Sequence, residues 1–159
     1  MNMIKQFITG MMTAAVLSLS SCGSGEKDPA AYNNSIITVI NSSEKHVTDM
    51  NAAMNGSDYT KAEQVRADWE KSLNDDIKKV EDLGDFKGDA IFQKAVLDGL
   101  NGYKKIVTED YPKLIKLRKN KTPDAAKESE LLENINKAFE NMSNGVNQAS
   151  TAFESKYKS

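Results

Sequence analysis

The chain has 159 residues, of which 28% are charged, and its formal net charge is −2. This balance lacks the strongly basic character of nucleic-acid-binding proteins, so we expect no nucleic-acid partner. It holds one cysteine and one histidine, which excludes an internal disulfide, a Cys-x-x-Cys-His haem site and the paired histidines of di-iron bundles.

The N-terminal segment has the layout of a secretory signal. Lys5 is the only charged residue before an apolar stretch over residues 7–19, which ends in small residues. As a helix this stretch is about 20 Å long, whereas the hydrocarbon core of a bilayer is about 30 Å thick. Residues 1–21 are therefore predicted to be a signal peptide and not part of the folded domain.

A short motif closes that segment. Leu19-Ser20-Ser21-Cys22 resembles the lipobox of bacterial lipoproteins. The resemblance implies cleavage between Ser21 and Cys22, diacylation of the Cys22 sulfur and acylation of its new amino group. No cofactor is predicted besides this covalent lipid. It also implies a protein that is exported and lipid-anchored to a bacterial membrane, the outer membrane being favoured over the inner one. Residues 22–28 are then a polar, lipidated tether.

Residues 29–159 are predicted to form one all-α domain of four amphipathic helices. The first begins at Asp28-Pro29 and has a left-handed stop at Asn55-Gly56, as an N-cap, a proline at the first position and a terminal glycine indicate. The second ends at Gly84, the third begins at Asp89 and the fourth begins at Thr122-Pro123. The apolar stripe is most regular in the fourth helix, at Leu132, Ile135, Phe139, Met142, Val146, Ala149, Phe153 and Tyr157.

Long helices joined by short loops favour an antiparallel up-down-up-down four-helix bundle. The third helix is its irregular member. Gly99 and Gly102 lower its helix propensity, and Pro112 removes one backbone hydrogen bond. A kink is therefore expected near Pro112, between Thr108 and Pro112.

The end of the third helix is rich in cations, at Lys113, Lys116, Arg118, Lys119 and Lys121. One interpretation is a site for an anion or an acidic partner. The other, which we favour, is that the helix macrodipole attracts cations to a C-terminus. In the predicted topology this basic tip is at the end of the bundle away from the membrane.

Helix register brings a large aromatic residue and several small ones to one level of the bundle. Counting along each predicted helix places Trp69 beside Ser42-Ser43, Gly99, Gly102 and Gly145. These residues form either a small apolar pocket walled by Trp69 or a set of small side chains that makes room for the indole. Close packing of protein cores favours the second interpretation.

The residues offer little catalytic chemistry. His46 and Asp49 lie one helical turn apart, but zinc sites need three or four ligands, so no metal site is predicted. No nucleophile elbow or oxyanion loop is present, and enzyme activity is not expected. The leading hypothesis is a non-enzymatic, membrane-anchored envelope or surface lipoprotein that acts as a protein-interaction module for an unidentified envelope protein. The alternative is a carrier or sensor of a small apolar ligand held in the bundle core.

Overall fold

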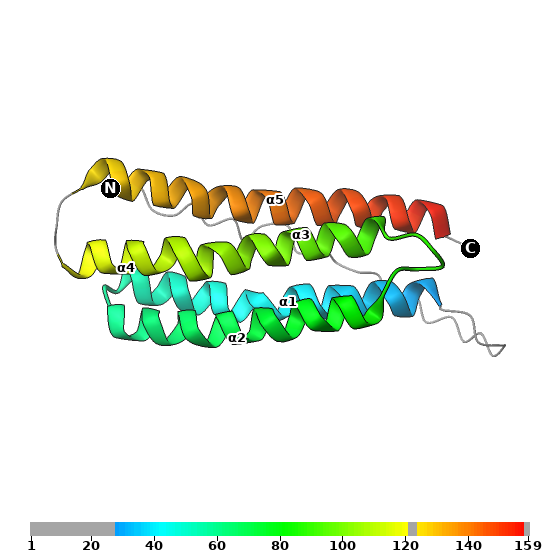
Figure 1. Cartoon of the computed structure of the whole chain (residues 1–159), viewed down its shortest axis with the longest axis horizontal. Helices are drawn as coiled ribbons and strands as arrows, with labels where there is room; N and C mark the ends of the chain where they lie inside the picture. The colour runs from blue at the N-terminus through cyan, green and yellow to red at the C-terminus, as the bar shows by residue number, and fades with distance from the viewer. Residues whose placement is uncertain (1–27, 121–123, 158–159) are drawn as a thin grey trace.

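The computed structural model describes residues 28–120 and 124–157. These residues form an all-α fold in which α3, a π-helical segment η1 and α4 follow one another without a break. The described residues therefore make four rods that pack as a four-helix bundle, which confirms the predicted fold class (Figure 1). In chain order the elements are α1 (Pro29–Asn55), α2 (Tyr59–Leu83), α3 (Ile91–Lys105), η1 (Ile106–Asp110), α4 (Tyr111–Lys119) and α5 (Ala125–Tyr157).

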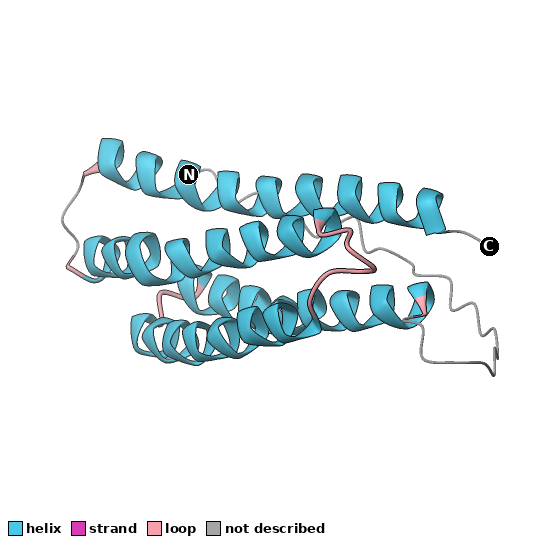
Figure 2. Ribbon diagram, turned by 45° about the vertical axis from the view of Figure 1, so that its right-hand side comes forward, coloured by secondary structure: helices cyan, strands magenta, loops and turns pink. Residues whose placement is uncertain are grey.

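Successive rods run in alternating directions in Figure 1, and short connections join α1 to α2 and α2 to α3 in Figure 2. The α3–η1–α4 rod packs between α2 and α5, while α1 packs mainly against α2. The start of α1, the loop between α2 and α3 and the end of α5 share one end of the bundle (Figure 1). We call this the proximal end and the opposite one the distal end.

Side-chain caps fix the helix starts. The Asp28 carboxylate accepts hydrogen bonds from the backbone N–H groups of Ala30 and Ala31, at 3.4 and 3.0 Å, so α1 begins where the sequence predicts. Its end differs in detail, because Gly56 has a φ of −78° and Ser57, at 56°, is the left-handed residue. The predicted start of the fourth helix at Thr122-Pro123 lies outside the described residues. Within the described residues, the Asp124 carboxylate caps the start of α5 by accepting a hydrogen bond from the Lys127 N–H at 2.9 Å.

The sequence predicts a kink between Thr108 and Pro112, and at this place the structure has the π-helix η1. The Tyr111 N–H donates to the Ile106 carbonyl, five residues back. A proline ring clashes with the carbonyl four residues before it, here that of Thr108. We attribute the wider turn to relief of this clash. The rod thus continues past Pro112 with a local widening, and no break separates η1 from α4.

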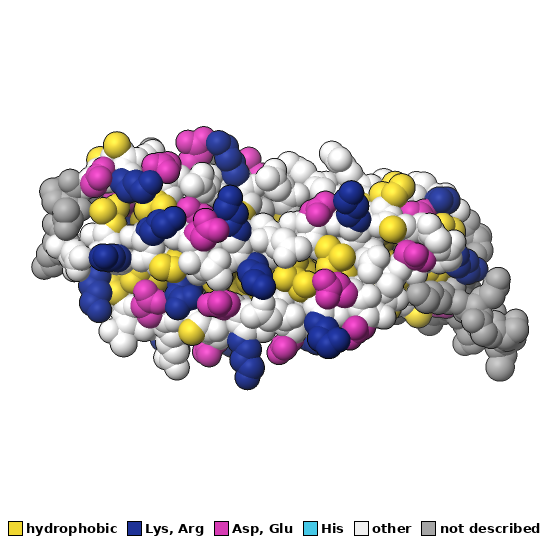
Figure 3. Space-filling view, in the orientation of Figure 1, with side chains coloured by type: hydrophobic (Ala, Val, Ile, Leu, Met, Phe, Trp, Pro, Cys, Tyr) yellow, Lys and Arg dark blue, Asp and Glu magenta, His cyan; other side chains and the backbone are white. Residues whose placement is uncertain are grey.

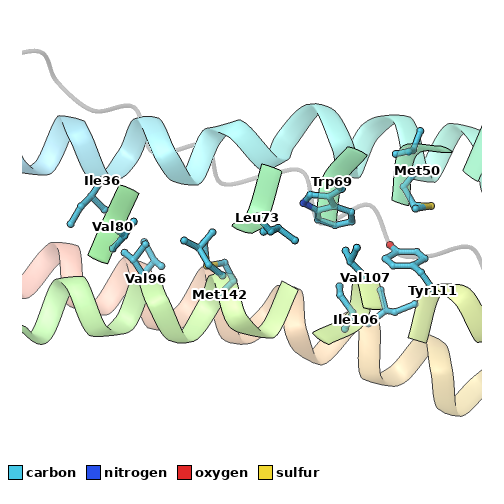
Figure 4. Packing of buried hydrophobic residues seen from close by; sticks show 14 of the residues in the cluster. Ile36, Met50, Trp69, Leu73, Val80, Val96, Ile106, Val107, Tyr111 and Met142 are labelled. Atoms are coloured by element: carbon cyan, nitrogen blue, oxygen red, sulfur yellow. The ribbon is translucent and has the colours of Figure 1, made fainter. Parts of the chain in front are cut away.

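The core contains two aromatic clusters. One, at the proximal end, joins α1, the α2–α3 loop, α3 and α5 through Tyr32, Phe86, Phe92, Phe153 and Tyr157. The second lies further along the bundle around Trp69, beyond Leu73 and Met142 (Figure 4). Phe86 belongs to a loop, yet it is fully buried. A tight turn positions it, with Phe86 and Asp89 exchanging backbone hydrogen bonds and with positive φ at Lys87 and Gly88.

Candidate functional site

A groove of about 610 Å³ runs between the α3–η1–α4 rod and α5. We call it the α3–α5 groove. Its apolar and small lining residues are Ala95, Gly99, Gly102, Ile106, Leu131, Ala138 and Gly145. Its polar lining residues are Asp98, Lys105, Glu109, Asp110, Lys113, Lys127, Glu130, Asn134, Lys137 and Asn141. Cations and carboxylates are interspersed on the face of the molecule that shows α3 and α5 (Figure 3).

The three glycines of this groove have different surroundings. A Cβ atom added to Gly99 would lie 2.0 Å from the Met142 sulfur, so Gly99 makes room for that side chain. A Cβ added to Gly102 or Gly145 would meet no atom within 4 Å. Both of these positions therefore face open space in the groove.

Trp69 does not line the groove. It is fully buried, and its Nε1 donates to the Ser43 hydroxyl at 3.3 Å. The indole stacks on His46, with ring centroids 6.3 Å apart, and it also contacts the rings of Tyr103 and Tyr111. The structure thus brings Trp69 and Ser43 together as the register suggested.

The three glycines do not share a pocket with Trp69. The residues proposed as one pocket, Trp69 with Gly99, Gly102 and Gly145, instead belong to a filled aromatic cluster and to an outward-facing groove. The favoured interpretation, that these glycines make room for the indole, needs a correction as well. The small residue that accommodates a large one is Gly99, and Met142 is the side chain it accommodates. Helix rotation causes the difference, since level alone does not say which way a residue faces.

Two phenols pack against the indole, those of the partly buried Tyr103 and of the buried Tyr111. Tyr111 is fully buried, and its hydroxyl has no hydrogen-bond partner in the described structure. It points from α4 toward Trp69 and Met50 (Figure 4). Burial raises the pKa of both Tyr103 and Tyr111, because the charged phenolate is poorly solvated in the core. This cluster is a packed interior in which the phenols stay neutral.

Asp110 is the unusual charge of the groove. It is the last residue of η1 and only 5% exposed. One carboxylate oxygen accepts a hydrogen bond from the Asn134 amide at 3.2 Å. No lysine, arginine or histidine of the described residues forms an ion pair with it. Sequence reasoning missed this residue because it lies within the stretch between Thr108 and Pro112 where the kink is expected, and a regular helical spacing cannot be followed there.

The basic tip is divided by the fold. Arg118 bonds to the Glu128 carboxylate through Nη2 at 2.6 Å and Nε at 2.8 Å, which links α4 to α5. Lys113 lines the α3–α5 groove. Lys116 and Lys119 are exposed in the last turn of α4, and Lys121 lies outside the described residues. The cations are therefore not gathered into one anion site in the part of the chain described.

A second buried carboxylate, also missed from the sequence, has a structural role. Asp76 of α2 is 1% exposed. It accepts hydrogen bonds from the hydroxyls of Ser42 and Ser72 and from the Lys79 ammonium, the last at 2.8 Å. These donors satisfy Asp76 and link α2 to α1, so its charge is compensated within the fold.

The His46–Asp49 pair considered as metal ligands is not formed. Asp49 pairs with Lys45, whose hydrogen bond lowers the pKa of the Asp49 carboxyl, while His46 stacks on Trp69. Within residues 28–120 and 124–157, no three His, Cys, Asp or Glu side chains are grouped to hold a metal ion.

Comparisons with protein-family models, curated proteins and solved structures found no match. None of the helices in the described ranges is long and apolar enough to cross a membrane. The predicted cleavage site at Ser21-Cys22 and the predicted lipidation of Cys22 lie outside the described residues.

Proposed function

We propose that this chain is a non-enzymatic, membrane-anchored bacterial lipoprotein that acts as a protein-interaction module. In this proposal the lipid on Cys22 holds the proximal end near the membrane, and the α3–α5 groove receives the protein partner. The resemblance of residues 19–22 to a lipobox supports the anchor. The small, apolar and charged residues that line the groove support its role as a contact surface for a protein.

The observation that carries the proposal is the presence of Gly102 and Gly145 in helix interiors. Glycine in a helix interior lowers the stability of the fold by about 0.5–1 kcal/mol relative to alanine. The fold does not require either residue, because neither has a positive φ and each leaves space where a Cβ would be. Glycines on two facing helices allow a further backbone to approach closely, which is a common use of this residue.

The anchor sets the orientation of the groove. Six residue steps separate Cys22 from Asp28, and an extended chain of that length reaches about 20 Å. The proximal end therefore stays close to the bilayer, and the groove runs away from it along α3 and α5. Two or three acyl chains hold a protein stably on a membrane, whereas one does not.

Replacing the lipidated residue tests the anchor. We expect Cys22→Ala to abolish labelling by a palmitate analogue, and to give either released protein or an uncleaved precursor. Ser24→Ala, two residues further on, is the matched control and should leave labelling and membrane fractionation unchanged. Palmitate labelling of the Cys22→Ala protein would rule out the proposed lipidation site.

A further inference from the structure

The charges along the α3–α5 groove are balanced. Carboxylates and lysines line it in equal numbers, and both signs occur on both walls. A contact between two copies of one chain about a two-fold axis brings the same surface against itself, so that surface must be self-complementary. A groove of one sign would repel its copy, whereas this one carries both signs. Two of its lysines are already paired within the chain, Lys127 with Glu130 and Lys137 with Glu133, so the charges available to a second copy include those of Asp110 and Lys113.

Asp110 is a buried carboxylate of the same groove, and no cation of the described residues pairs with it. Only 5% of its surface is exposed. Its carboxylate accepts one side-chain hydrogen bond, which comes from the neutral amide of Asn134. A buried carboxylate without a cation is costly, and a charged partner offsets that cost. Lys113 lines the same groove, is exposed and has no ion pair among the described residues.

We propose that two copies of this chain associate groove to groove as a parallel two-fold dimer. The backbones at Gly102 and Gly145 form the closest contact, and Asp110 of each copy pairs with Lys113 of the other. In a parallel dimer the same residues of the two copies are at the same height. Asp110 and Lys113 then differ in height by about 4.5 Å, which is within the reach of a lysine side chain.

The parallel orientation rests on the proposed function. If both copies are anchored through Cys22, their proximal ends are in one membrane and their bundles point the same way. The two grooves then face each other along their whole length. The antiparallel alternative would place one proximal end far from the bilayer.

Cysteine cross-linking in membranes tests this dimer. Asn141→Cys and Lys127→Cys each place a thiol on the groove wall formed by α5, about 21 Å apart along the helix. With a short bis-maleimide and the full-length protein, we expect each variant to give a covalent dimer. Asp68→Cys, exposed on α2 and outside the groove, and the unsubstituted chain are the controls and should stay monomeric.

Cross-linking at one groove position but not at the other would overturn the parallel arrangement. No cross-linking at either position, or equal cross-linking at Asp68→Cys, would overturn the second copy as the occupant. Membrane fractionation of the same samples separates this failure from failure of the anchor. An adduct of the groove cysteines with a different protein would likewise overturn the dimer while leaving the proposed function in place.

Filling the groove gives a second test. Gly145→Gln adds a side chain where the monomer has space, so the melting temperature should not fall. We expect the Asn141→Cys cross-link to decrease at least tenfold in this background. An undiminished cross-link in a folded Gly145→Gln protein would overturn the proposed contact.

Discussion

At the scale of single residues, the groove glycines differ in what a methyl group would meet. Gly99→Ala puts a Cβ against the Met142 sulfur, so that side chain must move and the fold should lose stability. Gly102→Ala and Gly145→Ala should each stabilise the fold by about 0.5–1 kcal/mol through higher helix propensity. Urea unfolding of the three variants measures these differences. A loss of stability in Gly102→Ala would mean that the fold itself requires that glycine.

Unlike Gly102 and Gly145, Trp69 contributes to the stability of the fold, since its whole side chain is buried. Trp69→Ala should lower the free energy of unfolding by about 3–5 kcal/mol, because it leaves a cavity among the rings of His46, Tyr103 and Tyr111. Ser43→Ala removes only the hydrogen bond to the indole and should cost about 1 kcal/mol. Thermal unfolding followed by circular dichroism compares the two. Equal, small losses would place Trp69 outside the core.

At the scale of elements, the loop between α2 and α3 closes the proximal end through Phe86. Phe86→Ala should cost about 3–5 kcal/mol, as for other buried phenylalanines. Ile91→Ala is the matched control, because Ile91 is close in sequence but 66% exposed, and surface substitutions change stability by about 0.5 kcal/mol or less. Denaturant unfolding distinguishes the two. Equal effects would contradict the role of the loop as part of the core.

The elements show which features the sequence predicts and which it does not. The three-and-four spacing of apolar residues predicts the four rods, because each helix is stabilised by burial of the apolar face that this spacing creates. The same spacing does not fix small rotations. In α5 the structure buries Leu131 at 1% exposure, while Leu132, the residue predicted for the stripe, is only partly buried.

Tertiary contacts account for the remaining differences. Phe86 has no periodic neighbours that identify it as a core residue, and its burial follows from the turn at Lys87 and Gly88. The register of the helices predicts that Gly99, Gly102 and Gly145 lie at the level of Trp69, but the structure places them in the groove and, for Gly99, against Met142. Their true surroundings depend on how α3 and α5 face each other, and no local pattern encodes that.

At the scale of the whole molecule, buried phenols link stability to alkaline pH. The Tyr32 hydroxyl donates to the Gly84 carbonyl at 2.8 Å. Burial, followed by the nearby Asp85 and Asp89 carboxylates, raises the pKa of Tyr32 from 10.0 to about 12. Because the folded state favours the neutral phenol, this stabilisation is complete below the unfolded pKa of 10.0 and is lost as the pH rises toward about 12. Tyr103 and Tyr111 act in the same direction.

We therefore expect the bundle to lose stability above pH 10, the ordinary pKa of tyrosine, with the buried tyrosines ionising as the helices unfold. Tyrosinate absorbance and far-UV circular dichroism, recorded on the same samples, measure the two events. Tyr32→Phe should make the loss less steep. Ionisation of every tyrosine while the helical signal stays intact would contradict the burial of these phenols.

The central claim is that the α3–α5 groove contacts a protein at the membrane, and in-cell photo-cross-linking tests it most directly. A photoreactive residue at Asn141 should give a discrete protein adduct, either a dimer or a complex with one partner. The same residue at Asp68, on exposed α2 surface, should give none, and Gly145→Gln should remove the Asn141 adduct. No adduct at Asn141, or identical patterns at both positions, would contradict the claim.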